Sequence, residues 1–177
     1  MAFNLSSFKS NMTADGARAS LFEVMLVKPS GITTGAVTNF NFKIRGASIP
    51  GATIGAIDVP YMGRILKFAG NRTYPDWTTT IINDEDFAVR KYIEKWMAGI
   101  ASHPGNVRTA NAVGPSAYTA DLSVKQLGKS GSTTALRTYT FEDAFPTDIA
   151  EIPLDWGDTD TIEEFSVTWS YQFWTAS

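Results

Sequence analysis

Apolar and polar residues alternate along much of the chain, which is the pattern of strands that bury one face. The longest run covers residues 162–174, and the apolar members of its inner face are Phe165, Val167, Trp169, Tyr171 and Phe173. The same alternation predicts strands over residues 39–45 and 118–126, and residues 21–27 predict a strand that is apolar on both faces. Further strands are predicted over 54–59, 64–68, 76–82 and 134–141, with a short extended piece around Ile149. Segments rich in glycine, proline and small residues separate them, at 28–37, 107–116 and 128–132.

The apolar period changes between Asn83 and Ala101. Apolar residues recur there at steps of three and four, namely Phe87, Val89, Ile93, Trp96, Met97 and Ile100. This spacing predicts an amphipathic helix over about residues 84–101. Asn83 or Asp84 would cap its first turn, and Pro104 with Gly105 would end it.

A second local signal is the sequence Pro60-Tyr61-Met62-Gly63, which lies between the extended segments 54–59 and 64–68. Proline and glycine in this order are typical of a turn, so the region predicts a hairpin that carries exposed apolar residues. Exposed apolar area is unfavourable in a monomer but useful where another subunit covers it.

About eight strands and one helix, joined mostly by short loops, indicate a mainly β (α+β) fold. We expect two packed antiparallel sheets, forming a β-sandwich or barrel, with the helix flanking one end or face. The chain has 177 residues, 44% of them hydrophobic, which is enough for one domain with a full core. Residues 1–19 are polar and are expected to form an irregular N-terminal arm.

Charge and composition exclude several functions. The net charge is −3 and cysteine is absent. Tight binding of nucleic acid is therefore not expected, and disulfides, thiolate zinc sites and cysteine nucleophiles are excluded. The first nineteen residues lack the apolar core of a signal peptide. No apolar run reaches the roughly 18 residues of a membrane span, and no cofactor is indicated.

The candidate chemical sites are weak. His103, the single histidine, follows the helix and is better explained as a loop residue than as a general base. Gly128-Lys129-Ser130 resembles the end of a phosphate-binding loop, but the required earlier glycine is replaced by Ser123. An acidic cluster lacks the spacing of a calcium loop and is better explained as a solvated loop or a patch that faces a neighbouring subunit: Asp155, Asp158, Asp160, Glu163 and Glu164. The sequence predicts neither an enzyme nor a metal site.

Two blocks of sequence carry a family resemblance. The first comprises residues 59–64, 68–73, 76–78 and 82–85, and the second comprises Leu154-Asp155-Trp156 followed by 162–167. In their order and spacing they resemble the tail tube proteins of contractile-tailed (myovirus) bacteriophages.

The resemblance implies a two-sheet β fold with a flanking helix. It also implies that six copies form a ring, and that rings stack into a hollow tube that conducts DNA inside a contractile sheath. The expected partners are the sheath, baseplate and tail terminator proteins, and the expected location is the virion tail, assembled in the host cytoplasm. The acidic chain agrees with a lumen that DNA passes without specific binding.

The residues expected at contacts between subunits are Pro60, Tyr61, Met62, Asp155 and Trp156. Three alternatives stay open from the sequence: a baseplate tube-initiator protein, a contractile secretion-system tube protein of the same fold, and a β-barrel that binds a small apolar ligand. An enzyme ranks last.

Overall fold

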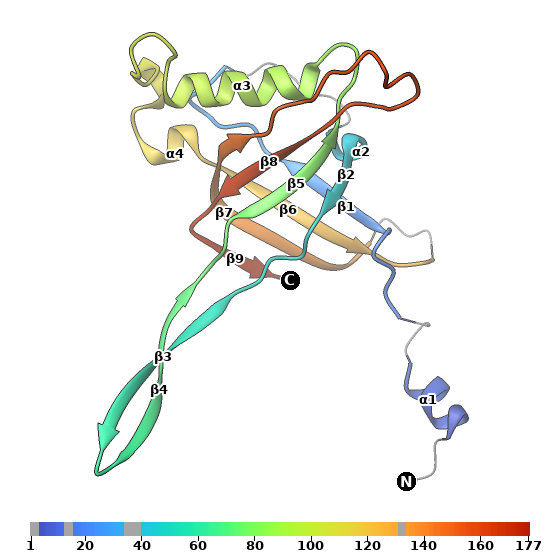
Figure 1. The fold of residues 1–177 in the computed structure, drawn as a ribbon, viewed down its shortest axis with the longest axis vertical. Helices are drawn as coiled ribbons and strands as arrows, with labels where there is room; N and C mark the ends of the chain where they lie inside the picture. Colours follow the sequence, from blue (N-terminus) through green and yellow to red (C-terminus); the bar gives the residue numbers. More distant parts are fainter. Residues whose placement is uncertain (1–3, 13–15, 34–39, 131–133) are drawn as a thin grey trace.

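The computed structural model describes residues 4–12, 16–33, 40–130 and 134–177 (Figure 1). The strands are β1 (Phe22–Leu26), β2 (Ile44–Ala47), β3 (Thr53–Tyr61), β4 (Arg64–Thr73), β5 (Trp77–Ile82), β6 (Ala120–Leu127), β7 (Ala135–Ile149), β8 (Glu164–Ser170) and β9 (Phe173–Ala176). The helices are α1 (Leu5–Asn11), α2 (Phe40–Lys43), α3 (Ala88–Ile100) and α4 (Pro115–Tyr118), with a 3-10 turn, η2, at Ala110–Ala112. The mainly β prediction is confirmed.

Seven of the strands form one bent antiparallel sheet in the order β1-β6-β7-β8-β5-β2, and β9 also pairs with β7. The 15-residue strand β7 pairs with β6 through its first part and with β8 through its last part, so it joins two halves of the sheet. A bulge marks the bend, because β7 has one extra residue between Phe141 and Ala144. Asp143 there has a φ of 55°. Bulges bend a strand and increase its twist, which brings the two halves face to face.

Aromatic side chains fill the space between the halves. The rings of Trp77 and Phe141, one from each half, lie 4.3 Å apart, and Trp169 of β8 packs against Trp96 of the helix α3 at 5.7 Å. The Trp169 indole N–H donates to the hydroxyl of the buried Thr79 at 3.0 Å. The alternation that predicted the strand at 162–174 is thus confirmed over β8, whose inward side chains are buried.

That strand is interrupted, however, at Tyr171 and Gln172. The break lies opposite the β7 bulge, which disturbs the ladder of hydrogen bonds at that point. The Gln172 N–H still donates to the Glu142 carbonyl at 3.1 Å, and β9 then resumes pairing with β7. The predicted short piece around Ile149 is instead the continuation of β7 through Pro146.

The predicted strand at 39–45 is wrong for Phe40–Lys43, which form the short helix α2 before β2 begins. Phe40 and Ile44 are both buried. Residues four apart share a face in a helical turn as well as in a strand, so alternation alone could not separate the two. Asn39 lies outside the described residues. Helix α2 lies between the edge strands β1 and β2, and the Asn41 side-chain amide donates to Glu23 at 2.9 Å.

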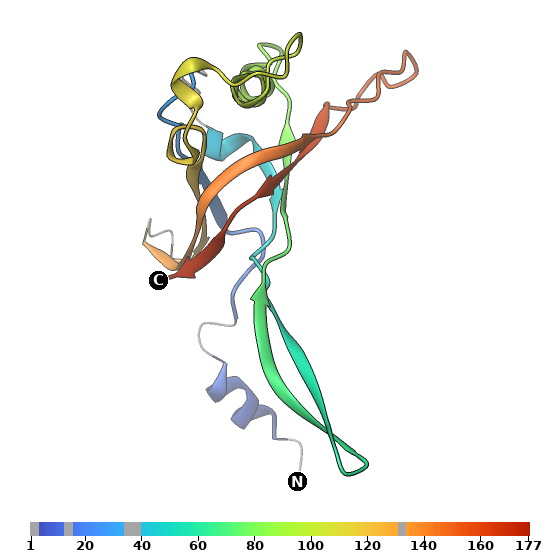
Figure 2. The same cartoon turned by 90° about the vertical axis from the view of Figure 1, so that its left-hand side faces the viewer.

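The helix α3 lies across the end of the sheet (Figures 1 and 2). It buries Val89, Tyr92, Ile93, Trp96 and Gly99. The Trp96 indole donates to the carbonyl of Tyr118 at 2.6 Å, which fastens the helix to α4.

The helix starts four residues later than predicted, and neither expected cap residue caps it. The Asn83 N–H and side-chain amide instead bond to Glu163 at 2.9 and 2.8 Å, and Asp84 pairs with Lys43. The N-cap is Phe87 in the left-handed conformation, and the Asp86 carboxylate accepts from the N–H of Ala88 at 3.0 Å. Tertiary contacts therefore engage the two side chains that were expected to cap the helix.

The N-terminal arm is not wholly irregular, since residues 5–11 form the exposed helix α1 with Asn4 as its cap. Helical turns η2 and α4 also interrupt the predicted loop at 107–116. Of the predicted turn at 128–132, residues 128–130 are turn or irregular, and 131–132 lie outside the described residues.

Candidate assembly surfaces at the two ends of the molecule

The hairpin of β3 and β4 stands away from the body of the molecule (Figures 1 and 2). It forms a separate two-stranded sheet. Every residue in it is exposed except Gly70, which is half-buried. An isolated two-stranded hairpin is marginally stable in water at best, so this element needs a covering surface.

The register of the hairpin separates an apolar face from a mixed face. The directly opposed pairs Ile57–Phe68 and Val59–Leu66 project to one side, together with Tyr61. The other side carries Asp58 opposite Lys67 and Pro60 opposite Ile65. All five residues of the apolar face are exposed, Phe68 to 55%. We call Ile57, Val59, Tyr61, Leu66 and Phe68 the apolar hairpin face.

The turn of the hairpin is shorter than the predicted Pro60–Gly63. Tyr61 and Arg64 still pair, so only Met62 and Gly63 connect the strands. Their φ angles are 44° and 82°, as a type I′ turn requires. The Met62 side chain is 89% exposed at the tip, and Pro60 and Tyr61 belong to β3.

At the opposite end of the molecule, residues 150–163 form the loop between β7 and β8, which we call the β7–β8 loop (Figure 2). Both ends of this loop are fastened. The Arg90 guanidinium donates to the Ala150 carbonyl at 3.2 Å, and Asn83 bonds to Glu163 through its backbone and its side chain. The loop is therefore held in place at its base by the helix α3 and the turn before it.

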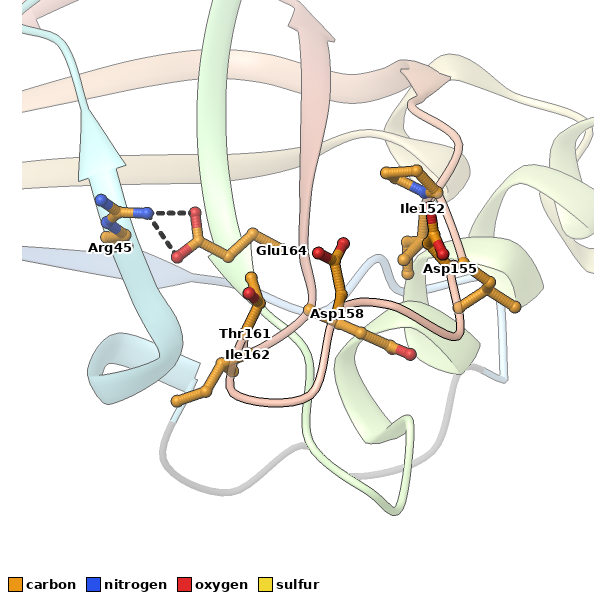
Figure 3. Close-up of a pocket in the computed structure, with 10 residues that line it drawn as sticks. Arg45, Ile152, Asp155, Asp158, Thr161, Ile162 and Glu164 are labelled. Atoms are coloured by element: carbon orange, nitrogen blue, oxygen red, sulfur yellow. Dashed lines mark hydrogen bonds and ion pairs between the residues drawn. The ribbon is translucent and has the colours of Figure 1, made fainter.

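A pocket of about 340 Å³ lies between this loop and β2 (Figure 3). Its lining combines apolar and acidic residues: Arg45, Ile152, Pro153, Leu154, Asp155, Asp158, Thr161, Ile162, Glu163 and Glu164. Arg45 forms an ion pair with both oxygens of Glu164. The Asp155 carboxylate accepts from the N–H of Gly157 at 2.8 Å. Within the described residues the Asp158 carboxylate has no hydrogen bond or ion pair.

The two segments that project at these ends carry opposite charge. The β7–β8 loop contains five acidic residues and no lysine, arginine or histidine. The hairpin, residues 53–73, contains Arg64, Lys67 and Arg72 but only one acid, Asp58. A net negative end and a net positive end on one molecule favour contacts that join unlike ends of two copies.

The predicted contact residues divide between these ends. Pro60, Tyr61 and Met62 lie at the hairpin tip, and Asp155 and Trp156 lie on the β7–β8 loop. Trp156 is fully exposed, at 102%. The fold does not bring the two groups together within one chain. The sequence missed the division of the hairpin into two faces and the part of Arg45 in the pocket, because both depend on strand register.

One further group of acids lies at the β7 bulge and was not singled out from the sequence. Burial, followed by the charges of Asp121 and Asp143, raises the pKa of the Glu142 carboxyl above its ordinary value. The Asp143 carboxylate accepts from the Thr119 hydroxyl at 2.9 Å, and the Asp121 carboxylate accepts from the Asp143 N–H at 3.2 Å. The group therefore supports the bulge.

The residues considered for chemistry are scattered. His103 lies in an exposed turn after α3, and Gly128-Lys129-Ser130 lies after β6. Among the described residues, no group of three or more histidine or acidic side chains could hold a metal ion. Within the same part of the chain, no helix has the length and apolar character needed to cross a bilayer.

The sequence profile described as phage tail tube protein matches residues 17–177. The chain belongs to this family. It is 30% identical to the tail tube protein gp19 of Enterobacteria phage T4 over 162 residues, which cover 92% of this chain and 93% of that protein. The family resemblance predicted from the sequence is confirmed, and with it a role as a structural protein of the phage tail rather than an enzyme.

Solved structures agree on the fold. A chain of the anti-feeding prophage baseplate, described as 6-fold symmetrised, superposes with a TM-score of 0.60 at 13% identity, covering 94% of this chain and 97% of that one. A chain of the sheath-tube complex of an extracellular contractile injection system, in the extended state, superposes with a TM-score of 0.57 at 14% identity, covering 99% of each. At this identity the likeness shows the tail tube fold alone.

Proposed function

We propose that six copies of this chain form a ring, and that the rings stack into the hollow tube of a contractile tail. The observation that carries the proposal is the detached hairpin, whose apolar face is uncovered within the chain. A second copy can supply the missing cover, and the family is one of tube proteins.

The arrangement of the two ends supports stacking in one direction. The hairpin and the β7–β8 loop lie at opposite ends of the long axis (Figure 1). Contacts between unlike surfaces of identical subunits continue indefinitely unless rotation closes them into a ring. Lateral contacts that close produce the ring, whereas end-to-end contacts that do not close extend the tube. We therefore assign Pro60, Tyr61, Met62, Asp155 and Trp156 to contacts between subunits.

A ring of six is supported by the family and by the sixfold baseplate that contains a chain of the same fold. Six copies, at −3 each, carry a total charge of −18. A tube without a positive surplus lets DNA pass, since each phosphate contact with a lysine or arginine would add affinity. The partners follow from this role: a contractile sheath, the baseplate, and a terminator at the far end. Assembly takes place in the host cytoplasm.

We also assign residues 1–177 to one tail-tube domain with an N-terminal arm of residues 1–19. The family profile begins at residue 17, and the exposed helix α1 lies before that point.

A tube-initiator protein of the baseplate and a secretion tube share the fold and remain the second candidate function. The match to a chain of the sixfold baseplate favours the initiator role specifically. Copy number per particle separates the two roles, because a tube subunit is present in every ring and an initiator only at the base.

Negative-stain microscopy and sedimentation velocity of the purified full-length chain test the proposal. We expect six-subunit rings at low concentration and stacked tubes at high concentration. A protein that stays monomeric at every concentration would refute it.

A further inference from the structure

The hairpin tip is apolar and positively charged, whereas the pocket between the β7–β8 loop and β2, which we call the β7–β8 pocket, is lined by apolar and acidic residues. We propose that the tip of one copy, Met62 with Arg64, inserts into the β7–β8 pocket of a copy in the next ring. This inference rests on the proposed stacking of rings and specifies which surfaces meet.

The tip has the form of an inserting element. A two-residue turn is among the shortest connections between antiparallel strands, so the end of the hairpin is narrow. Met62 is its most exposed side chain, at 89%. Methionine is flexible and polarisable, and it fills irregular apolar hollows well. Arg64 pairs with Tyr61 directly beside the turn and brings a cation to the same point.

The pocket has a matching lining. Ile152, Leu154 and Ile162 provide apolar surface for a methionine. Asp155 and Asp158 line the same hollow, and the Asp158 carboxylate has no partner within the described residues. Four acids line the pocket against one arginine, Arg45, which is already paired with Glu164. An incoming arginine therefore finds unpaired negative charge, and such a charge-assisted contact is stronger than a neutral one.

The occupant must come from another copy. The hairpin tip and the β7–β8 loop, which supplies most of the pocket lining, lie at opposite ends of the long axis of the molecule (Figures 1 and 2). The tip cannot reach the pocket of its own chain. Trp156 follows Asp155 in the chain and is fully exposed, so its ring is available for a cation–π contact with the incoming copy.

Disulfide cross-linking tests the contact between tip and pocket directly, because the chain contains no cysteine of its own. The test variant combines Met62→Cys with Thr161→Cys. Thr161 lines the pocket and is uncharged, so its replacement leaves the acidic residues of the pocket in place. A disulfide needs Cα atoms within about 7 Å of one another. Oxidation of assembled tubes should therefore yield a ladder of linked chains on a denaturing gel, and reduction should remove it.

The control variant combines Met62→Cys with Ala101→Cys. Ala101 is exposed and directly follows the last residue of α3. The control variant should yield no species larger than a dimer. Two results would overturn the proposed contact while leaving ring stacking intact. In one, the test variant forms tubes that are visible by microscopy but gives only monomers on the gel after oxidation. In the other, the test and control variants give equal ladders. Failure of the unmodified chain to form tubes would refute the stacking itself.

Charge reversal provides a second test if the cysteine variant does not assemble. Arg64→Glu should raise the critical concentration for tube formation about tenfold. Adding Asp158→Lys on the same chain should bring the critical concentration most of the way back to that of the unmodified chain. Lys67→Glu makes the same change of charge on the mixed face of the hairpin. Equal losses from Arg64→Glu and Lys67→Glu, or no rescue by Asp158→Lys, would show that the tip is not seated in this pocket.

Discussion

Replacing Phe68 by serine should abolish tube growth without unfolding the subunit. Phe68 belongs to the apolar hairpin face and is 55% exposed. Full burial of a phenylalanine is worth about 1.5–3 kcal/mol, so covering its exposed half contributes about 1 kcal/mol. In the stacking of six-subunit rings proposed above, an added ring makes this contact six times. The loss is then about 6 kcal/mol per ring, which is roughly ten-thousandfold in the equilibrium constant for adding one ring.

The assay is the polymer fraction recovered by sedimentation over a range of protein concentrations, with tubes counted by electron microscopy. Size-exclusion chromatography should show rings of normal size, and the thermal midpoint should change little, because Phe68 lies outside the packed core. Lys67→Ser is the matched control, since Lys67 is the adjacent residue and points to the other face. Normal tubes from Phe68→Ser, or equal losses from the two variants, would show that no neighbouring copy covers the apolar hairpin face in the tube.

Three further predictions concern the fold. Gly31→Ala should lower the free energy of unfolding by about 1–3 kcal/mol in urea titrations, because its new Cβ would lie 2.3 Å from the carbonyl oxygen of Asn111, whereas Gly51→Ala, with no atom within 4 Å, should be near neutral. Trp96→Phe should cost at least about 2 kcal/mol in the same titration, since it leaves the carbonyl at the end of α4 without its donor; a smaller loss would mean that this hydrogen bond does not fasten the helix. Because the pKa of Glu142 is raised, the folded chain holds this proton more tightly than the unfolded chain, so the free energy of unfolding should fall as the pH rises above the ordinary glutamate value. In thermal melts, the stability of Glu142→Gln should lack this decrease with rising pH. Identical pH profiles for the variant and the unmodified chain would contradict the prediction.

Strand positions were predictable where one face of a strand is buried. The alternation around Phe165, Val167 and Trp169 identified β8, because a period of two is imposed by the pleat itself. The amphipathic pattern likewise identified α3 through residues such as Trp96. The exposed hairpin was visible from its turn residues and from apolar residues that a monomer has no reason to expose. These features are local, so the sequence contains them.

The start of α3, the identity of α2 and the bend of β7 were decided by tertiary contacts. Asn83 could cap a helix or bond to Glu163, and only the proximity of the β7–β8 loop selects the second. The bulge near Asp143 depends on how β6 and β7 are paired, which no single strand encodes.

The candidate contacts divide in the same way. The sequence by itself singled out Met62, Asp155 and Trp156 as residues expected at contacts between subunits. Only the tertiary structure decided that they lie at opposite ends of the molecule, and that Arg45 helps to form the pocket beside Asp155. The physical reason is that turn chemistry and periodicity act over a few residues, whereas a surface is formed from segments that meet only after the sheet has folded.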